Sequence, residues 1–165
     1  MAMMMMMMMM MMMMMMAMMM MMMVSCLWCV QGLGSLKKLR LLSIQSNRIT
    51  VLEGLEELEN LEELYVSNNG IREIRGLQRN VKLTTLDLAS NSIQRVANVG
   101  HLVLLEEFWF NHNLLEDWRD VDQLRGARNL QTVYFEGNPI AKDTQYRRKL
   151  KLALPTLTQI DATMC

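Results

Sequence analysis

Two cysteines near the start of the chain have the spacing of a metal or redox site. Cys26 and Cys29 form a C-x-x-C pair, which is half of a zinc site or the dithiol of a redox protein. A zinc site needs two further ligands, but the two histidines, His101 and His112, lie far along the chain, and Cys165 stands alone at its end. We therefore predict an apolar leader around the pair, with no metal and no cofactor.

Paired carboxylates are the second candidate for chemistry, because they can act as general acid and base. Glu63 and Glu107 stand in similar strings, Glu-Glu-Leu-Tyr and Glu-Glu-Phe-Trp, which predicts that they share one open surface. Acid–base catalysis needs an enclosed, desolvated site, and an open surface supplies none. The sequence also has no Ser-His-Asp grouping and no glycine-rich phosphate loop, and we interpret His112 as a surface residue. We predict a protein that is not an enzyme.

The charge balance and the first residues exclude further classes. The chain carries 17 basic and 17 acidic side chains, whereas nucleic-acid binders usually show a basic excess, so we expect no nucleic-acid partner. The run of methionines over residues 1–23 lacks basic flanks, aromatic anchors and a cleavage-site pattern, so we expect no membrane span and no signal peptide there. Three cysteines without a secretory signal favour a reducing, intracellular compartment.

A repeated pattern must position any functional surface. The pattern L-x-x-L-x-L-x-x-N-x-L, with other apolar residues in place of some leucines, occurs over residues 39–49, 61–71, 83–93, 105–115 and 130–140. Successive asparagines are 22 residues apart except for the last pair, which is 25 apart because of a short insertion around residues 126–128. This period and pattern are typical of a leucine-rich repeat, in which each repeat is one turn of a solenoid. The asparagines of the five repeats are Asn47, Asn69, Asn91, Asn113 and Asn138.

The periodicity within each repeat predicts its elements. Residues alternate around the L-x-L string, as a short strand requires, and apolar residues then return at every third position, which favours 3₁₀ turns. The asparagine amides are expected to satisfy backbone groups where each strand ends, and so to be structural. The predicted fold is an α/β leucine-rich-repeat solenoid with a short parallel concave sheet, 3₁₀ or helical convex returns and a C-terminal helical cap. We divide the chain into a disordered or artefactual leader (1–34), five repeats (36–140) and the cap (141–165).

The cap is predicted to contain one amphipathic helix. Asp143 is the expected N-cap, and Pro155 follows the end of the helix. The apolar residues expected to face the open end of the solenoid are Tyr146, Leu150, Leu152 and Ala153. Five cations make the segment basic, which is typical of a solvated helix face and leaves a partner or phosphate patch as the alternative: Lys142, Arg147, Arg148, Lys149 and Lys151.

The outward strand positions predict a protein-binding surface. Three rows should lie on the concave face, and together they carry three aromatic side chains and four carboxylates with no Lys or Arg. Tyrosine and tryptophan dominate protein interfaces, and the carboxylates would select a basic partner. The residues of this predicted site are Tyr65, Trp109, Tyr134, Glu63, Asp87, Glu107 and Glu136.

Several longer strings closely resemble one intracellular family. They are Leu-Leu-Ser-Ile-Gln-Ser-Asn-Arg-Ile (41–49), Glu-Glu-Phe-Trp (106–109), Thr-Val-Tyr-Phe-Glu (132–136), Asp-Thr-Gln-Tyr-Arg-Arg-Lys (143–149), Leu-Ala-Leu-Pro (152–155) and Gln-Ile-Asp-Ala-Thr (159–163). Over about residues 36–163 the chain resembles the C-terminal half of the leucine-rich-repeat regulatory subunit of protein phosphatase 1. Residues 1–34 match nothing in that family, and its first repeats have no counterpart here.

This resemblance implies a non-catalytic subunit that binds the phosphatase catalytic subunit through its concave face, often with a further inhibitor protein, in nucleus and cytoplasm. Four of the family's contact positions have matching residues here, namely Asp87, Glu107, Trp109 and Tyr134. Tyr65 and Glu63 are added because they lie in the same rows of outward strand residues. Two alternatives stay open. One is a structural adaptor of the same fold in a splicing or cytoskeletal complex, and the other is a truncated chain without a function of its own.

Overall fold

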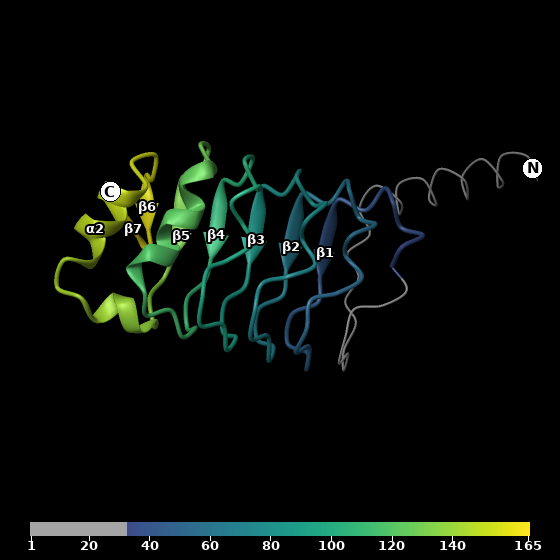
Figure 1. Cartoon of the computed structure of the whole chain (residues 1–165), viewed down its shortest axis with the longest axis horizontal. Helices are drawn as coiled ribbons and strands as arrows, with labels where there is room; N and C mark the ends of the chain where they lie inside the picture. Colours follow the sequence, from purple (N-terminus) through teal and green to yellow (C-terminus); the bar gives the residue numbers. More distant parts are fainter. Residues whose placement is uncertain (1–32) are drawn as a thin grey trace, which may run out of the picture.

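The computed structural model describes residues 33–165 as a single row of coils. Each of the first five coils contributes one three-residue strand, and the strands lie side by side in parallel (Figure 1). The predicted solenoid is therefore confirmed. The predicted leader falls almost wholly outside the described residues, as do Cys26 and Cys29. The strands are β1 (Leu41–Ser43), β2 (Glu63–Tyr65), β3 (Thr85–Asp87), β4 (Glu107–Trp109) and β5 (Thr132–Tyr134).

The repeat period fixes the register of this sheet. Leu42 pairs with Leu64, Leu64 with Leu86, and Leu86 with Phe108, so that equivalent residues of successive repeats stand next to one another. All four of these side chains are fully buried. Because side chains alternate across a strand, the residues on either side of this buried row face outward. We call that outward side of the sheet, which corresponds to the predicted concave surface, the strand face.

Aromatic rings fill the core toward the end of the solenoid. Phe108 lies 5.4 Å from Phe110 and 5.8 Å from Phe135, measured between ring centroids, and Phe110 lies 5.9 Å from Phe135. All three rings are fully buried. Aromatic residues bury more apolar area than the leucines of the earlier repeats, so this cluster makes a large contribution to the stability of the stack.

Between β1 and β5 the returns that join the strands are turns rather than helices, with one exception. In the return between β1 and β2, for example, the amide of Leu58 donates to the carbonyl of Leu55 and the amide of Leu61 to that of Leu58, both at 3.0 Å. These bonds have the predicted three-residue spacing but do not run on into a helix. The exception is the 3₁₀ helix η1 (Trp118–Gly126), which occupies the longer return between β4 and β5 and begins at the carboxylate cap of Asp117.

Four of the repeat asparagines bond to two coils at once. The Asn113 side chain, only 3% exposed, accepts from the amide of Ile93 at 3.0 Å and donates to the carbonyls of Leu88 at 2.9 Å and Phe110 at 3.2 Å. Asn69, Asn91 and Asn138 repeat this arrangement. In the first coil, Asn47 donates to the carbonyls of Ile44 and Gln45.

Substituting one of these asparagines tests their role in stability. Asn113→Ala leaves the amide of Ile93 without its acceptor, so the free energy of unfolding should fall by about 1–3 kcal/mol. Asn111→Ala is the matched control, because that side chain lies two residues away at the half-buried surface. Urea denaturation followed by circular dichroism measures both. Equal losses in the two variants would contradict a structural role for the repeat asparagine.

The cap closes the end of the solenoid and extends its sheet. It consists of η2 (Pro139–Lys142), the helix α2 (Tyr146–Ala153) and two short strands, β6 (Gln159–Ile160) and β7 (Thr163–Met164). β6 pairs with β5 in parallel and β7 with β6 in the antiparallel sense. The Tyr146 hydroxyl donates to Asp161 at 2.9 Å, and Asp161 accepts from the amide of Phe135 at 2.8 Å, which ties the cap to the last repeat. Within residues 33–165 no helix is long and apolar enough to cross a bilayer.

Two details predicted for the cap helix are wrong. The N-cap residue is Gln145 and not Asp143, whose carboxylate instead accepts from the amide of Gln145 at 2.8 Å. Leu152 does not face the solenoid and is 71% exposed. It lies two residues beyond the buried Leu150, on the other side of the helix, whereas Tyr146 and Leu150 are four residues apart and share a face.

Candidate protein-binding face

The residues expected to contact a partner lie on adjacent strands of the strand face. The central row runs, in register, through Ser43, Tyr65, Asp87, Trp109 and Tyr134. A neighbouring row runs through Leu41, Glu63, Thr85, Glu107 and Thr132 and continues into Gln159 of the cap. Tyr65, Trp109 and Tyr134 are half-buried, as are Glu63 and Glu107, so each keeps surface that a partner can contact.

Tyr65 lies in a strongly acidic environment. Its hydroxyl donates to a carboxylate oxygen of Glu63 at 2.8 Å. Burial of the phenol, followed by the hydrogen bond and charge of Glu63 and the charges of Glu107 and Asp87, raises the pKa of Tyr65 to about 12. Three carboxylates from three strands therefore act on one side chain. This is the electrostatic signature of a surface that attracts cations.

The raised pKa of Tyr65 has a measurable consequence at alkaline pH. The unfolded chain releases the phenol proton near pH ~10, whereas the folded protein holds it to about pH 12. The contribution to stability is present below the unfolded pKa and is lost as the pH rises from about 10 to about 12. The urea midpoint of the wild type should therefore fall more steeply over that interval than that of Tyr65→Phe. Parallel curves for the two proteins would contradict this assignment.

Asp87 belongs to the central row but does not present a free carboxylate. It is only 2% exposed, because Gln45 reaches over it and donates to one of its oxygens at 2.9 Å. Its other oxygen accepts from the amide of Ala89 at 2.9 Å, and Gln45 also donates to Ser67 at 2.9 Å. Asp87 is predicted to face outward on the concave surface, but the structure covers it. Asp87 contributes charge and rigidity to the strand face rather than a direct contact.

Trp109 and Tyr134 form the aromatic end of the row. Their ring centroids are 5.4 Å apart at an interplanar angle of 57°. The Tyr134 hydroxyl accepts from Gln159 of β6 at 2.7 Å, so the cap helps to orient this ring. The indole nitrogen of Trp109 is buried and has no hydrogen-bond partner among residues 33–165. An N–H in that state has lost its water without gaining an acceptor, which costs free energy.

The loops beyond the strands place Glu136 and His112 at the surface. Glu136 is exposed, and its backbone carbonyl accepts from the amide of His112 at 2.8 Å. His112 is also exposed and has a left-handed backbone with φ of 55°, at the turn position that Ser90 and Asn68 occupy in the preceding repeats. Across residues 33–165, no three His, Cys, Asp or Glu side chains come together as metal ligands. The metal or redox alternative for Cys26 and Cys29 lies outside the described residues.

The roles of two glutamines of this face were not anticipated from the sequence. Gln45 and Gln159 each hold a residue of the central row, the first by bonding Asp87 and the second by bonding Tyr134. The alternation of Gln159 with the buried Ile160 is the signal that would have placed β6 in the sheet. No sequence signal gives the reach of Gln45, because that depends on its side-chain rotamer.

Comparison with known protein families agrees with this architecture. The family model described as Leucine Rich repeats (2 copies) matches residues 37–79, and a single Leucine Rich repeat model matches residues 79–95. The protein has a leucine-rich-repeat fold. An internalin of Listeria monocytogenes has the same fold, with a TM-score of 0.70 and 24% identity over 87% of this chain and 39% of that one.

Curated relatives of this leucine-rich-repeat chain are regulatory subunits of a phosphatase. It is 66% identical over 50 residues to human protein phosphatase 1 regulatory subunit 7, which covers 30% of this chain and 14% of the human protein. It is 48% identical over 63 residues to protein phosphatase 1 regulatory subunit SDS22 of Schizosaccharomyces pombe, which covers 36% of this chain and 19% of that protein. The chain is homologous to these subunits over segments that span less than a fifth of their length.

Proposed function

We propose that this chain is a non-catalytic scaffold that binds the catalytic subunit of protein phosphatase 1 through its strand face. The names of its homologues supply the identity of the partner. The strand face supplies the chemistry, because it combines exposed aromatic surface with carboxylates and carries no Lys or Arg in its outward rows. The proposal includes a further inhibitor protein in the complex and a location in nucleus and cytoplasm, as expected for such a subunit.

The observation that carries this proposal is the state of Trp109. Its ring lies against Tyr134 at the surface, while its buried indole N–H has no acceptor among the described residues. A partner that covers the exposed part of this ring removes further apolar surface from water, and the buried N–H has no bond to water left to lose on binding. Tryptophan in a partly desolvated setting, surrounded by other contacts, is the commonest kind of interface hot spot.

The carboxylates of the neighbouring row define the charge of the partner surface. Glu63 and Glu107 stand on either side of Thr85 in the register, and both act on the pKa of Tyr65. A basic patch on the partner gains from these charges in the approach as well as in the complex. The association rate should therefore fall as salt is added, because salt screens exposed charges.

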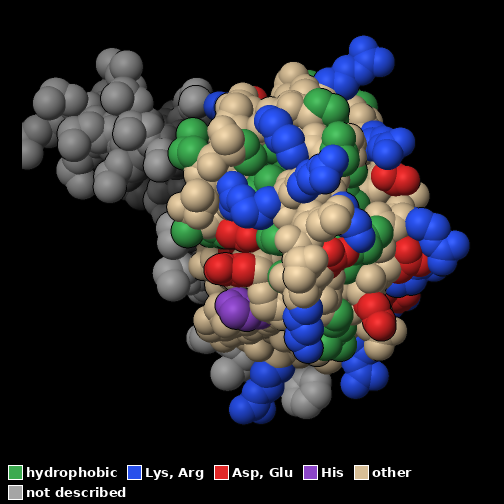
Figure 2. Space-filling view, turned by 90° about the vertical axis from the view of Figure 1, so that its left-hand side faces the viewer, with side chains coloured by type: hydrophobic (Ala, Val, Ile, Leu, Met, Phe, Trp, Pro, Cys, Tyr) green, Lys and Arg blue, Asp and Glu red, His purple; other side chains and the backbone are tan. Residues whose placement is uncertain are grey.

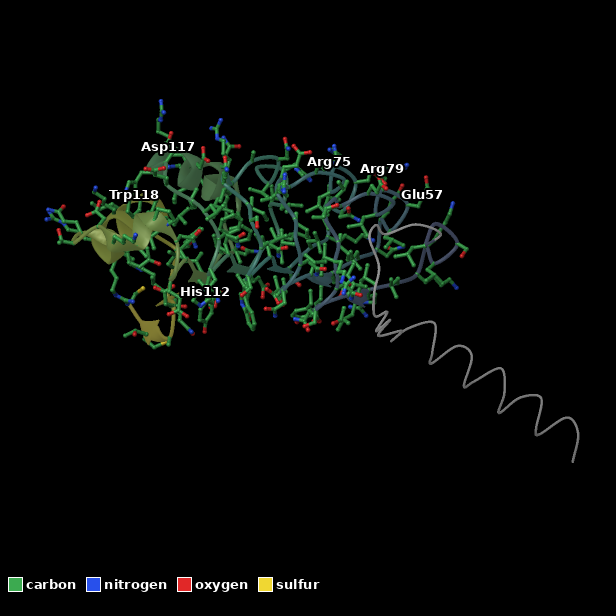
Figure 3. The ribbon with its side chains drawn as sticks, turned by 90° about the horizontal axis from the view of Figure 1, so that it is seen from below. Glu57, Arg75, Arg79, His112, Asp117 and Trp118 are labelled. Atoms are coloured by element: carbon green, nitrogen blue, oxygen red, sulfur yellow. The ribbon has the colours of Figure 1, made fainter. Side chains whose placement is uncertain are left out.

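Charge reversal on the strand face tests this function. Glu63→Lys/Glu107→Lys should lower the association rate with purified phosphatase catalytic subunit by about tenfold or more at low salt. The control is Glu57→Lys/Glu73→Lys, which changes the net charge by the same amount but lies elsewhere on the surface. Glu57 and Arg75, the ion-pair partner of Glu73, lie on the side of the molecule away from His112 (Figure 3).

Surface plasmon resonance over a series of salt concentrations compares the two double variants. Equal effects on the association rate would contradict the strand face as the binding site. Absence of binding by a folded wild-type chain would contradict the phosphatase as the partner and favour an adaptor in another complex.

A further inference from the structure

A second surface lies at the cap, away from the strand face. There the 3₁₀ helix η1 passes beside α2, and two adjoining hollows of about 420 and 360 Å³ open between them. Arg125, Leu152 and Ala153 line both hollows, which therefore form one continuous depression. We call it the cap groove. The residues that bear on its chemistry are Trp118, Arg125 and Arg128 on the η1 side and Lys149, Leu152 and Pro155 on the cap side.

The floor of the cap groove is apolar. Leu152, at 71%, has the largest exposed fraction of the large hydrophobic side chains within residues 33–165. One exposed leucine is ordinary on a protein surface. Here, however, the partly buried Trp118 and Ala153 and the exposed Pro155 line the same groove. A large apolar side chain of a partner can enter this depression and bury surface on Leu152.

The rim of the cap groove is mainly cationic. It is lined by four cationic side chains and by one carboxylate, that of Asp122. The cations are Arg119, Arg125, Arg128 and Lys149. Figure 2, which views the cap end, shows Lys and Arg side chains spread over this end with hydrophobic side chains exposed between them. Lys149 also lies over the Trp118 ring, 5.2 Å from its centroid. A basic helix face that contacts only water does not need exposed apolar side chains between its cations. The apolar floor therefore favours the partner patch, which was the alternative for this segment.

Lys149 is held by an ion pair with Asp143, whereas the three arginines of the rim remain available to a partner. Arg119 pairs with Asp117 at 2.7 Å and Arg125 with Asp122 at 3.0 Å, but all four side chains are more than a third exposed. Exposed ion pairs of this kind are weak, so a carboxylate of a partner can replace the aspartate in either pair. Arg128 is exposed and has no charged or hydrogen-bonded partner among residues 33–165.

We propose that the cap groove binds an acidic segment of a partner protein that carries one large apolar side chain. The apolar side chain packs on Leu152, and carboxylates before and after it pair with Arg125 and Arg128. Charge complementarity selects this occupant, and a depression lined by apolar side chains suits a peptide side chain better than a flat membrane. Trp118 lies on the side of the molecule away from His112 and the strand face (Figure 3), so both surfaces can be occupied together.

A peptide selection on the full chain tests this proposal. A display library of random dodecapeptides is selected against the wild type, and affinities of enriched peptides are measured by fluorescence anisotropy. We expect a class of peptides with Asp or Glu on both sides of one Phe, Trp or Leu. Leu152→Glu and Arg125→Glu/Arg128→Glu should each weaken these peptides at least tenfold. Because all three side chains are exposed, the variants should fold, which circular dichroism checks.

Matched measurements distinguish binding in the cap groove from binding elsewhere on the chain. Glu107→Lys on the strand face should leave the acidic peptides bound with unchanged affinity, which also separates this result from the phosphatase proposal. The proposal is overturned if no acidic class is enriched, or if its binding survives both cap-groove variants. It is also overturned if a phosphoserine peptide without an apolar residue, or vesicles containing anionic lipid, bind the groove as tightly as the acidic peptides do.

Discussion

Phe108→Ala should lower the free energy of unfolding by about 3–5 kcal/mol, the largest stability effect we expect from one substitution. Phe108 is fully buried in β4, and its ring contacts Phe110 at 5.4 Å and Phe135 at 5.8 Å between centroids. Removing it leaves a cavity between two coils. Such a loss is comparable with the whole stability of many domains, which is about 5–15 kcal/mol.

The location of Phe108 makes this result informative about the solenoid. In the sheet each strand pairs only with its neighbours, so a cavity under β4 should uncouple the cap and β5 from the earlier coils. Urea denaturation followed by circular dichroism should show a lower midpoint and a broader transition than the wild type. Leu114→Ala is the control, since that leucine is 48% exposed and should change the free energy of unfolding by less than about 0.5 kcal/mol. A loss below about 1 kcal/mol in Phe108→Ala would contradict the packing described here.

Trp109→Ala should weaken binding to the phosphatase catalytic subunit by about 2 kcal/mol or more, which is roughly 30-fold in the dissociation constant. The substitution removes the half-buried ring beside Tyr134, whose indole N–H is already cut off from water in the free chain. Most of the change should appear in the dissociation rate, because packing rather than long-range charge is lost. Biolayer interferometry with the immobilised full chain measures both rates.

The control for Trp109→Ala is the same substitution on the other side of the molecule. Trp118 is also partly buried, but it contacts Tyr146 of the cap and lies away from the strand face (Figure 3). Trp118→Ala should bind the phosphatase as the wild type does, provided that circular dichroism shows the variant to be folded. A folded Trp109→Ala protein with wild-type affinity would move the binding site away from the end of the central row.

The parts of the fold that could be predicted are those that the repeat itself specifies. A 22-residue period places Tyr65 beside Asp87 and Trp109 beside Asp87 whatever the details of the returns, since each coil repeats the backbone of the one before. The amide of Asn113 has the same surroundings as that of Asn91, because the carbonyls that it bonds recur with the period. These strand neighbours and hydrogen bonds follow from the repeat period, which can be read directly from the sequence.

The parts that could not be predicted depend on side chains from different coils. Asp87 has an outward strand position, but Gln45, two strands away, covers it. Leu152 is apolar and lies in the cap helix, yet its angular position places it on the exposed side. The cap groove likewise needs η1 and α2 to be adjacent. Arg125 and Lys149 lie far apart in the sequence, and only the packed structure brings them to one depression.

A calorimetric titration of the full chain with purified protein phosphatase 1 catalytic subunit tests whether the strand face binds the phosphatase. It is made for the wild type and for the Glu107→Ala/Trp109→Ala double variant, both shown to be folded by circular dichroism. We expect saturable binding at one site for the wild type and an affinity at least roughly 30-fold lower for the double variant. Wild-type affinity in the double variant, or no binding by the folded wild type, would contradict a phosphatase site on the strand face.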